Sequence, residues 1–74
     1  MELTEDMVVP GTVFKGMTKC DGVHLDHETR TIRKVEEGQV SYTLHIGEAR
    51  HSSYKFDMAA FIRMMNRHNT WGKE

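Results

Sequence analysis

The chain has 74 residues, of which 38% are hydrophobic and 28% charged, and this balance predicts one small globular domain with a thin core. The formal net charge of −1 argues against a dedicated nucleic-acid binder. No apolar run approaches the roughly 20 residues that cross a membrane, and the acidic start lacks the basic residues of a secretory signal. The one cysteine, Cys20, has no internal disulfide partner, so we expect a reducing cytoplasm.

The beginning of the chain combines turn signals with one short run of strand-forming residues. Residues 1–7 are mostly polar and are expected to form a flexible lead. A Pro-Gly turn within residues 8–11 leads into a strand of β-branched and aromatic residues at 12–15. A glycine and an Asp-Gly pair follow, so residues 16–28 are expected to form a long loop or a hairpin tip.

A second strand is predicted at residues 29–35, with an interruption in its alternation. Ile32 and Val35 are three positions apart, so they can share a face of the sheet only across a β-bulge near Arg33 and Lys34. A tight turn follows this strand, and we expect Gly38 to take the positive φ that such a hairpin turn requires.

The clearest strand signal lies at residues 39–46. Four apolar residues alternate there with polar ones, namely Val40, Tyr42, Leu44 and Ile46. A period of two places alternate side chains on opposite faces, which predicts a strand in a sheet with one buried face.

The periodicity changes toward the C-terminus. Residues 49–53 are expected to form a short fourth strand, and residues 54–69 are expected to form a helix. The apolar residues of this segment recur at the spacing of an amphipathic helix, and they are Met58, Phe61, Ile62 and Met65. This stripe is expected to pack on the sheet face that carries Tyr42.

Together these elements predict a mainly β fold of the α+β kind. The expected architecture is an antiparallel, curled sheet of three or four strands with one C-terminal amphipathic helix packed on it. Within this single domain of residues 1–74, we expect a lead at 1–7, the sheet at 8–53, the helix at 54–69 and a tail at 70–74.

Four short motifs resemble a known class of proteins. They are Pro10-Gly11-Thr12-Val13-Phe14, Arg30-Thr31-Ile32-Arg33-Lys34-Val35, Gly38-Gln39-Val40-Ser41-Tyr42 and the segment from Phe56 to Phe61. This order resembles small SH3-like β-barrel domains encoded by bacteriophages and other bacterial mobile elements. The resemblance implies an SH3-like fold and a bacterial or phage-infected host cell, and it carries no catalytic residues. Residues 16–28 depart from the pattern.

One motif has the composition of a metal site. Cys20, His24 and His27 bring a thiol and two imidazoles together within eight residues, and zinc prefers such ligands. Structural zinc sites usually contain at least two cysteines, so an ordinary polar loop is the alternative.

Two further histidines belong to the predicted sheet. His45 lies on the polar face of the strand at residues 39–46, and His51 is expected on a neighbouring strand. The pair could bind a metal or respond to pH, and the alternative is that both are ordinary exposed residues.

Basic residues are distributed along the predicted strands. A basic strip for nucleic acid would consist of Arg30, Arg33, Lys34, Arg50 and Lys55. A solvated strand face is the alternative reading of the same residues.

The helix and the last strand supply a candidate surface for a protein partner. Its residues are His51, Tyr54, Arg63, Met64, Arg67 and Trp71. Methionine and aromatic side chains are common at such surfaces. The leading expectation is a non-enzymatic module, encoded by a phage or mobile element, that binds a host or phage protein as a monomer or an edge-paired homodimer. Nucleic-acid binding and a zinc-stabilised domain remain alternatives, and no motif indicates an enzyme.

Overall fold

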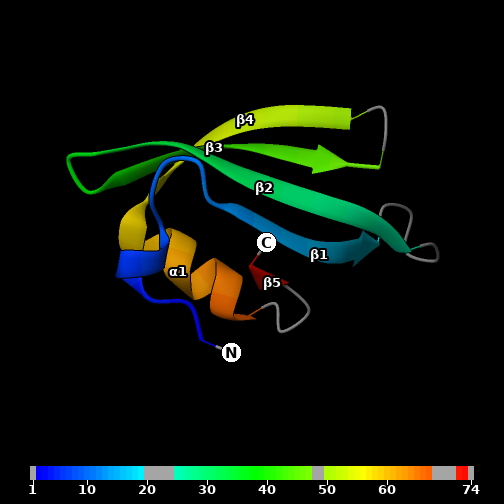
Figure 1. Ribbon diagram of the computed structural model, residues 1–74, viewed down its shortest axis with the longest axis horizontal. Helices are drawn as coiled ribbons and strands as arrows, with labels where there is room; N and C mark the ends of the chain where they lie inside the picture. Colours follow the sequence, from blue (N-terminus) through cyan, green and yellow to red (C-terminus); the bar gives the residue numbers. More distant parts are fainter. Residues whose placement is uncertain (1, 20–24, 48–49, 68–71, 74) are drawn as a thin grey trace.

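The chain folds as an antiparallel sheet with an α-helix across one face (Figure 1). The computed structural model describes residues 2–19, 25–47, 50–67 and 72–73, with side chains for 2–16, 27–47 and 51–67. The order of strands across the sheet is β4-β3-β2-β1-β5. In chain order the elements are η1 (Glu5–Met7), β1 (Val13–Lys19), β2 (Leu25–Glu36), β3 (Gln39–Ile46), β4 (Arg50–Asp57), α1 (Met58–Arg67) and β5 (Gly72–Lys73).

The predicted β-bulge is present in β2. The register between β2 and β3 shifts between Ile32 and Lys34. As a result, Ile32 pairs with Tyr42 and Val35 pairs with Val40, so the two apolar residues of β2 face the same side despite their spacing of three.

The turn between β2 and β3 has the geometry that was expected at Gly38. Gly38 has φ of 75° and Glu37 before it has φ of 51°. Two consecutive residues with positive φ form a two-residue hairpin turn whose twist matches that of the flanking antiparallel strands. Glycine tolerates this conformation, whereas the Cβ of Glu37 makes it costly.

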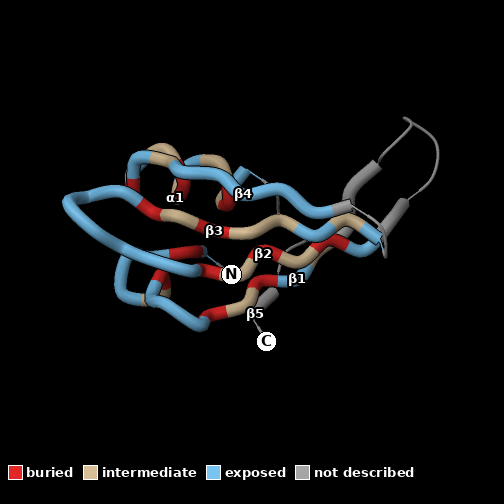
Figure 2. Tube along the Cα trace, turned by 90° about the horizontal axis from the view of Figure 1, so that it is seen from above, coloured by how far each residue is buried: buried red, intermediate tan, exposed pale blue. Residues whose placement is uncertain are grey.

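The core lies between the sheet and a layer formed by α1 and the N-terminal segment (Figure 1), and Figure 2 shows that β4 is largely exposed whereas β1, β2 and β3 carry buried positions. The predicted helix stripe is confirmed, because Met58, Phe61 and Met65 are buried and Ile62 is partly buried against the same cluster. The predicted contact with the sheet is confirmed too, since the Tyr42 and Phe61 ring centroids are 5.1 Å apart. The buried apolar residues are Leu3, Val8, Phe14, Ile32, Val40, Tyr42, Met58, Phe61 and Met65.

Helix α1 connects the two edges of the sheet. It follows β4, which lies at one edge, and it precedes β5, which pairs with β1 at the opposite edge (Figure 1). The chain therefore crosses one face of the sheet, and α1 covers that face on the way.

Several predicted boundaries need correction. Strands β1 and β2 extend far into residues 16–28. Strand β4 continues to Asp57, so residues 54–57 are strand and α1 begins only at Met58. Tyr54 and Phe56 continue the period of two and pair with Tyr42 and Val40, which outweighs their helical spacing to the residues that follow. Within the expected tail, residues 72–73 form β5.

The N-terminal segment is part of the core, and the expectation of a flexible lead at residues 1–7 is wrong for the described part. Leu3 is only 1% exposed. Its N–H donates to Asn66 Oδ1 at 2.6 Å, and Asn66 Nδ2 donates to the Leu3 carbonyl at 3.2 Å. The segment is ordered because burying a leucine side chain stabilises the fold by about 2 kcal/mol.

Candidate binding face of the sheet

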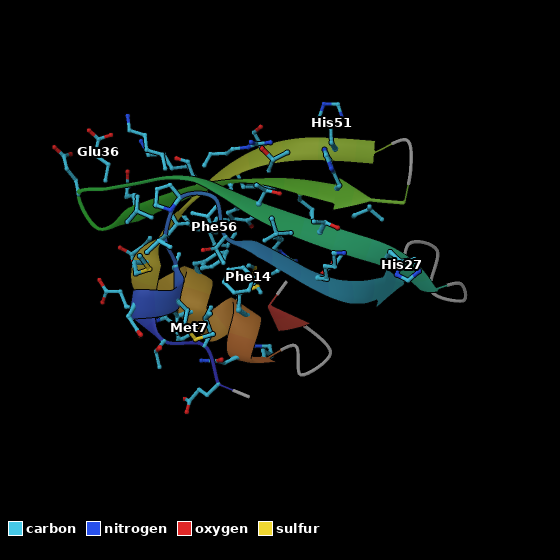
Figure 3. The ribbon with its side chains drawn as sticks, in the orientation of Figure 1. Met7, Phe14, His27, Glu36, His51 and Phe56 are labelled. Carbon is cyan, nitrogen blue, oxygen red and sulfur yellow. The ribbon has the colours of Figure 1, made fainter. Side chains whose placement is uncertain are left out.

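The two faces of the sheet differ in what covers them. Tyr42 contacts α1 through Phe61, and Thr43 and His45 alternate with Tyr42 along β3, so they lie on the opposite face. Figure 3 shows Phe14 on the helix side of the sheet and His51 on the other side. We call this second side the uncovered face, since no described helix packs on it.

Strand pairing arranges the side chains of the uncovered face in rows that run across the strands. Hydroxyls dominate the central row, histidines and a lysine occupy a second row, and lysines flank a serine in a third. The rows are Val13, Thr31, Thr43 and Ser53; then Lys15, Thr29, His45 and His51; then Lys34, Ser41 and Lys55.

The β-bulge places two consecutive cations on the uncovered face. In a regular strand, neighbouring side chains point to opposite sides. Here Lys34 pairs with Ser41, while Arg33 donates from Nε to Thr43 Oγ1 at 3.1 Å, so both contact residues of this face. Lys34 Nζ also lies 2.7 Å from Glu36 Oε2 in an exposed ion pair.

The uncovered face is therefore predominantly basic. Its described cations are Lys15, Arg33, Lys34 and Lys55. The acidic residues described at its edge are Glu36, which binds Lys34, and Asp57, which ends β4. Both lie toward the β2–β3 turn, where Figure 3 shows Glu36, and away from the histidine row.

The predicted basic strip is only partly assembled. Arg33, Lys34 and Lys55 share the uncovered face. The prediction for Arg30 is wrong, because Arg30 lies on the helix side and is only 8% exposed. Arg50 pairs with Ile46 through its backbone, and its side chain lies outside the described residues. Sequence reasoning missed Lys15 as a member of this face. The signal was its position next to Phe14, because neighbouring residues of a strand point to opposite faces and Phe14 is buried on the helix side.

Arg30 belongs to a buried polar cluster on the helix side. Its Nη1 donates to Glu28 Oε1 two residues earlier, and both residues are buried. Arg30 Nε is buried and has no hydrogen-bond partner among the described residues. Burial raises the pKa of the nearby Tyr42 hydroxyl, and the opposing effects of the Arg30 charge and hydrogen bond only partly offset this rise.

The predicted protein-binding residues do not form one surface. Arg63 and Arg67 are exposed on α1, and Met64 packs partly against the core. Tyr54 is 43% exposed on the helix side, where its ring stacks on Tyr42 with centroids 5.6 Å apart. His51 lies on the uncovered face, on the other side of the sheet. Trp71 lies outside the described residues.

The predicted metal motif is only partly described. Cys20 and His24 lie outside the described residues, and His27 is exposed in β2. Within the described ranges, no group of three or more His, Cys, Asp or Glu side chains could hold a metal ion. His45 and His51 form a directly opposed pair on β3 and β4, with ring centroids 5.4 Å apart and ring planes at 85°.

An open groove lies on the helix side, where η1 meets the start of α1. Its lining residues are Glu5, Asp57, Met58, Ala59, Ile62 and Arg63. Of the predicted partner-binding residues, it contains Arg63.

Comparisons with known proteins provide no relative. No protein-family model, no curated protein and no solved structure matches the chain. In the part of the chain that the structure describes, no helix is long and apolar enough to span a membrane. The candidate site thus rests on its own geometry.

Proposed function

We propose that the protein is a non-enzymatic binding module whose uncovered sheet face contacts the phosphate backbone of nucleic acid. The observation that supports this proposal most directly is the row arrangement of cations and hydroxyls. Lys15, Arg33, Lys34 and Lys55 surround a central row of threonine and serine hydroxyls. Lysine, arginine, serine and threonine side chains are the usual donors to phosphate oxygens.

The negative net charge of the chain does not oppose this proposal. Phosphate contact depends on the local field, and the sheet separates the charges of this chain by face. The buried cation Arg30 is neutralised by Glu28 on the helix side, while the four described cations of the uncovered face outnumber the two described carboxylates at its edge, Glu36 and Asp57.

The chemistry of the face favours contact with the backbone over reading of bases. The aromatic residues of the sheet, such as Tyr42, Tyr54 and Phe56, cluster on the helix side. Bases stack on aromatic platforms in single-strand binding proteins, and the described part of the uncovered face offers no Phe, Tyr or Trp side chain. We therefore expect binding that depends weakly on sequence and strongly on salt.

A salt titration with matched variants tests the proposal. The double variant Arg33→Gln/Lys55→Gln removes two charges from the uncovered face, and Arg63→Gln/Arg67→Gln removes two from α1. Binding of a labelled DNA duplex and a single strand is measured by fluorescence anisotropy between 50 and 200 mM salt. Over this range the rise in salt should weaken duplex binding through four phosphate contacts by about 150-fold.

The expected result is specific to the face. The Arg33→Gln/Lys55→Gln variant should reduce the slope of log K against log salt by about 1.8 for the duplex, since each phosphate contact contributes about 0.9. The α1 variant should keep the original slope. Equal losses in both variants, or no binding of either nucleic acid at 50 mM salt, would contradict the proposal.

A second candidate is a protein contact along the edge strand β4. It is favoured by the position of β4 at the edge of the sheet, since Tyr54 of this strand is 43% exposed. Edge strands pair readily with another chain. Sedimentation analysis across a range of concentrations tests a homodimer, and retention of a partner at high salt distinguishes this contact from phosphate binding. The resemblance to SH3-like phage-encoded domains stays a prediction.

A further inference from the structure

The uncovered face carries a second feature that phosphate contact does not use. His45 and His51 are directly opposite each other on neighbouring antiparallel strands. Both side chains are exposed, and their ring centroids are 5.4 Å apart. Side chains of directly paired residues stand side by side on the same face, so both imidazoles are available to one ligand between or above them.

The separation of the rings matches the geometry of a metal chelate. A Zn–N bond of about 2 Å puts the metal about 3.2 Å from the centroid of a ligating imidazole ring. Two such rings at the tetrahedral angle then have centroids about 5.2 Å apart. The observed 5.4 Å is close to this value, and the angle of 85° between the ring planes keeps the rings from stacking on each other.

We propose that His45 and His51 form a two-histidine site for a divalent transition-metal ion such as Zn²⁺. Imidazole nitrogen is a preferred ligand of zinc, nickel and copper. The two strands hold the ligands in place before the metal arrives, because β3 and β4 pair continuously from Gln39 with Asp57 to Ile46 with Arg50. Two protein ligands leave two of the four tetrahedral positions of zinc to water or an external ligand.

This site is distinct from the motif of Cys20, His24 and His27. In that motif His27 is the described member, and it lies on β2, on the far side of β3 from His51. His27 is also an exposed histidine of the sheet, so its substitution provides a matched control that removes an imidazole and keeps both members of the proposed pair.

Isothermal titration of the full chain with ZnCl₂ under reducing conditions tests the proposal. The variants are His45→Gln, His51→Gln, His27→Gln and Cys20→Ser. The proposed site predicts that His45→Gln and His51→Gln each weaken zinc binding by about tenfold or more, since even indirect contacts to a metal ligand contribute that much. His27→Gln and Cys20→Ser should bind zinc as the original chain does.

Other outcomes would overturn the inference. Absence of zinc binding by the original chain would exclude the site. Loss of binding in His27→Gln or Cys20→Ser, with binding intact in His51→Gln, would assign the metal to the other motif. Thermal unfolding with and without zinc gives a second readout, in which only the chains that retain both His45 and His51 should be stabilised.

Discussion

Arg33 and Thr43 are joined across β2 and β3 by a hydrogen bond of 3.1 Å from Arg33 Nε to Thr43 Oγ1. The bond holds the guanidinium of a bulge residue against the uncovered face. A side chain that is already oriented loses less conformational freedom when it binds a ligand. This contact therefore connects a local irregularity of β2 to the proposed binding of phosphate.

Removal of the acceptor hydroxyl should weaken nucleic-acid binding. Thr43→Val keeps the size and strand preference of the side chain, so the free energy of unfolding should change by less than about 1 kcal/mol. Affinity for a DNA duplex should fall about two- to tenfold, which corresponds to the ordering of one mobile side chain. In an Arg33→Gln background the same substitution should have no further effect, and additive losses would show that Thr43 acts independently of Arg33.

The buried pair of Glu28 and Arg30 should matter more for stability than the exposed pair of Lys34 and Glu36. Glu28→Gln leaves the Arg30 charge buried without its counter-ion, and such a loss costs about 3 kcal/mol. Glu36→Gln, the matched change in the exposed pair, should cost less than about 1 kcal/mol. Urea unfolding of the two variants measures the difference, and similar losses in both would contradict the role of burial.

Ionisation of Tyr42 should destabilise the fold at alkaline pH. Burial raises the pKa of Tyr42 above its ordinary value of 10.0, so the folded chain holds this proton more tightly than the unfolded chain does. The resulting stability is complete below pH 10 and is lost as the pH rises above it. In Tyr42→Phe the free energy of unfolding should fall less steeply as the pH rises above 10. A Tyr54→Phe control that flattened the profile equally would refute the assignment.

The N-terminal segment should contribute to stability through Leu3. Leu3→Ala should lower the free energy of unfolding by about 3 kcal/mol, because it removes a fully buried side chain and leaves a cavity. Val9 is 48% exposed, so Val9→Ala should change stability by less than about 0.5 kcal/mol. If Leu3→Ala were as mild as Val9→Ala in denaturant unfolding, the segment would not be part of the core in solution.

The β2–β3 turn offers a stabilising substitution. Glu37 has φ of 51°, a conformation that asparagine adopts at lower cost than glutamate. Glu37→Asn creates an Asn-Gly turn and should raise the free energy of unfolding by about 0.5 to 1 kcal/mol. Thermal unfolding checks this, with Glu36→Asn as the control, since that position lies in the strand and should lose stability.

The sequence was most informative where the periodicity was regular. The alternation at residues 39–46 and the helical spacing of Met58, Phe61 and Met65 predicted the buried face and its partner. The bulge also followed from a single irregular spacing, between Ile32 and Val35. These features are local, so one sequence is enough to detect them.

Other features depended on tertiary contacts. Arg30 was placed with the exposed cations because charged residues are seldom buried, yet its spacing of two from both Glu28 and Ile32 puts all three on one face. The backbone of Leu3 is held by hydrogen bonds with Asn66, far along the chain, and no local sequence pattern predicts this contact. The opposed rings of His45 and His51 required the register between β3 and β4.

The hydrogen bonds between Leu3 and Asn66 join residues 63 positions apart. At a translation rate of about 5 to 20 residues per second, Asn66 is synthesised several seconds after Leu3, so the core around Leu3 cannot be completed before then. The hairpins of β1 to β4 can pair earlier, since their partners are close in sequence. Assembly of the finished core is therefore expected to follow synthesis of the helix, so the nascent chain would carry an unprotected apolar sheet face on the ribosome until α1 emerges.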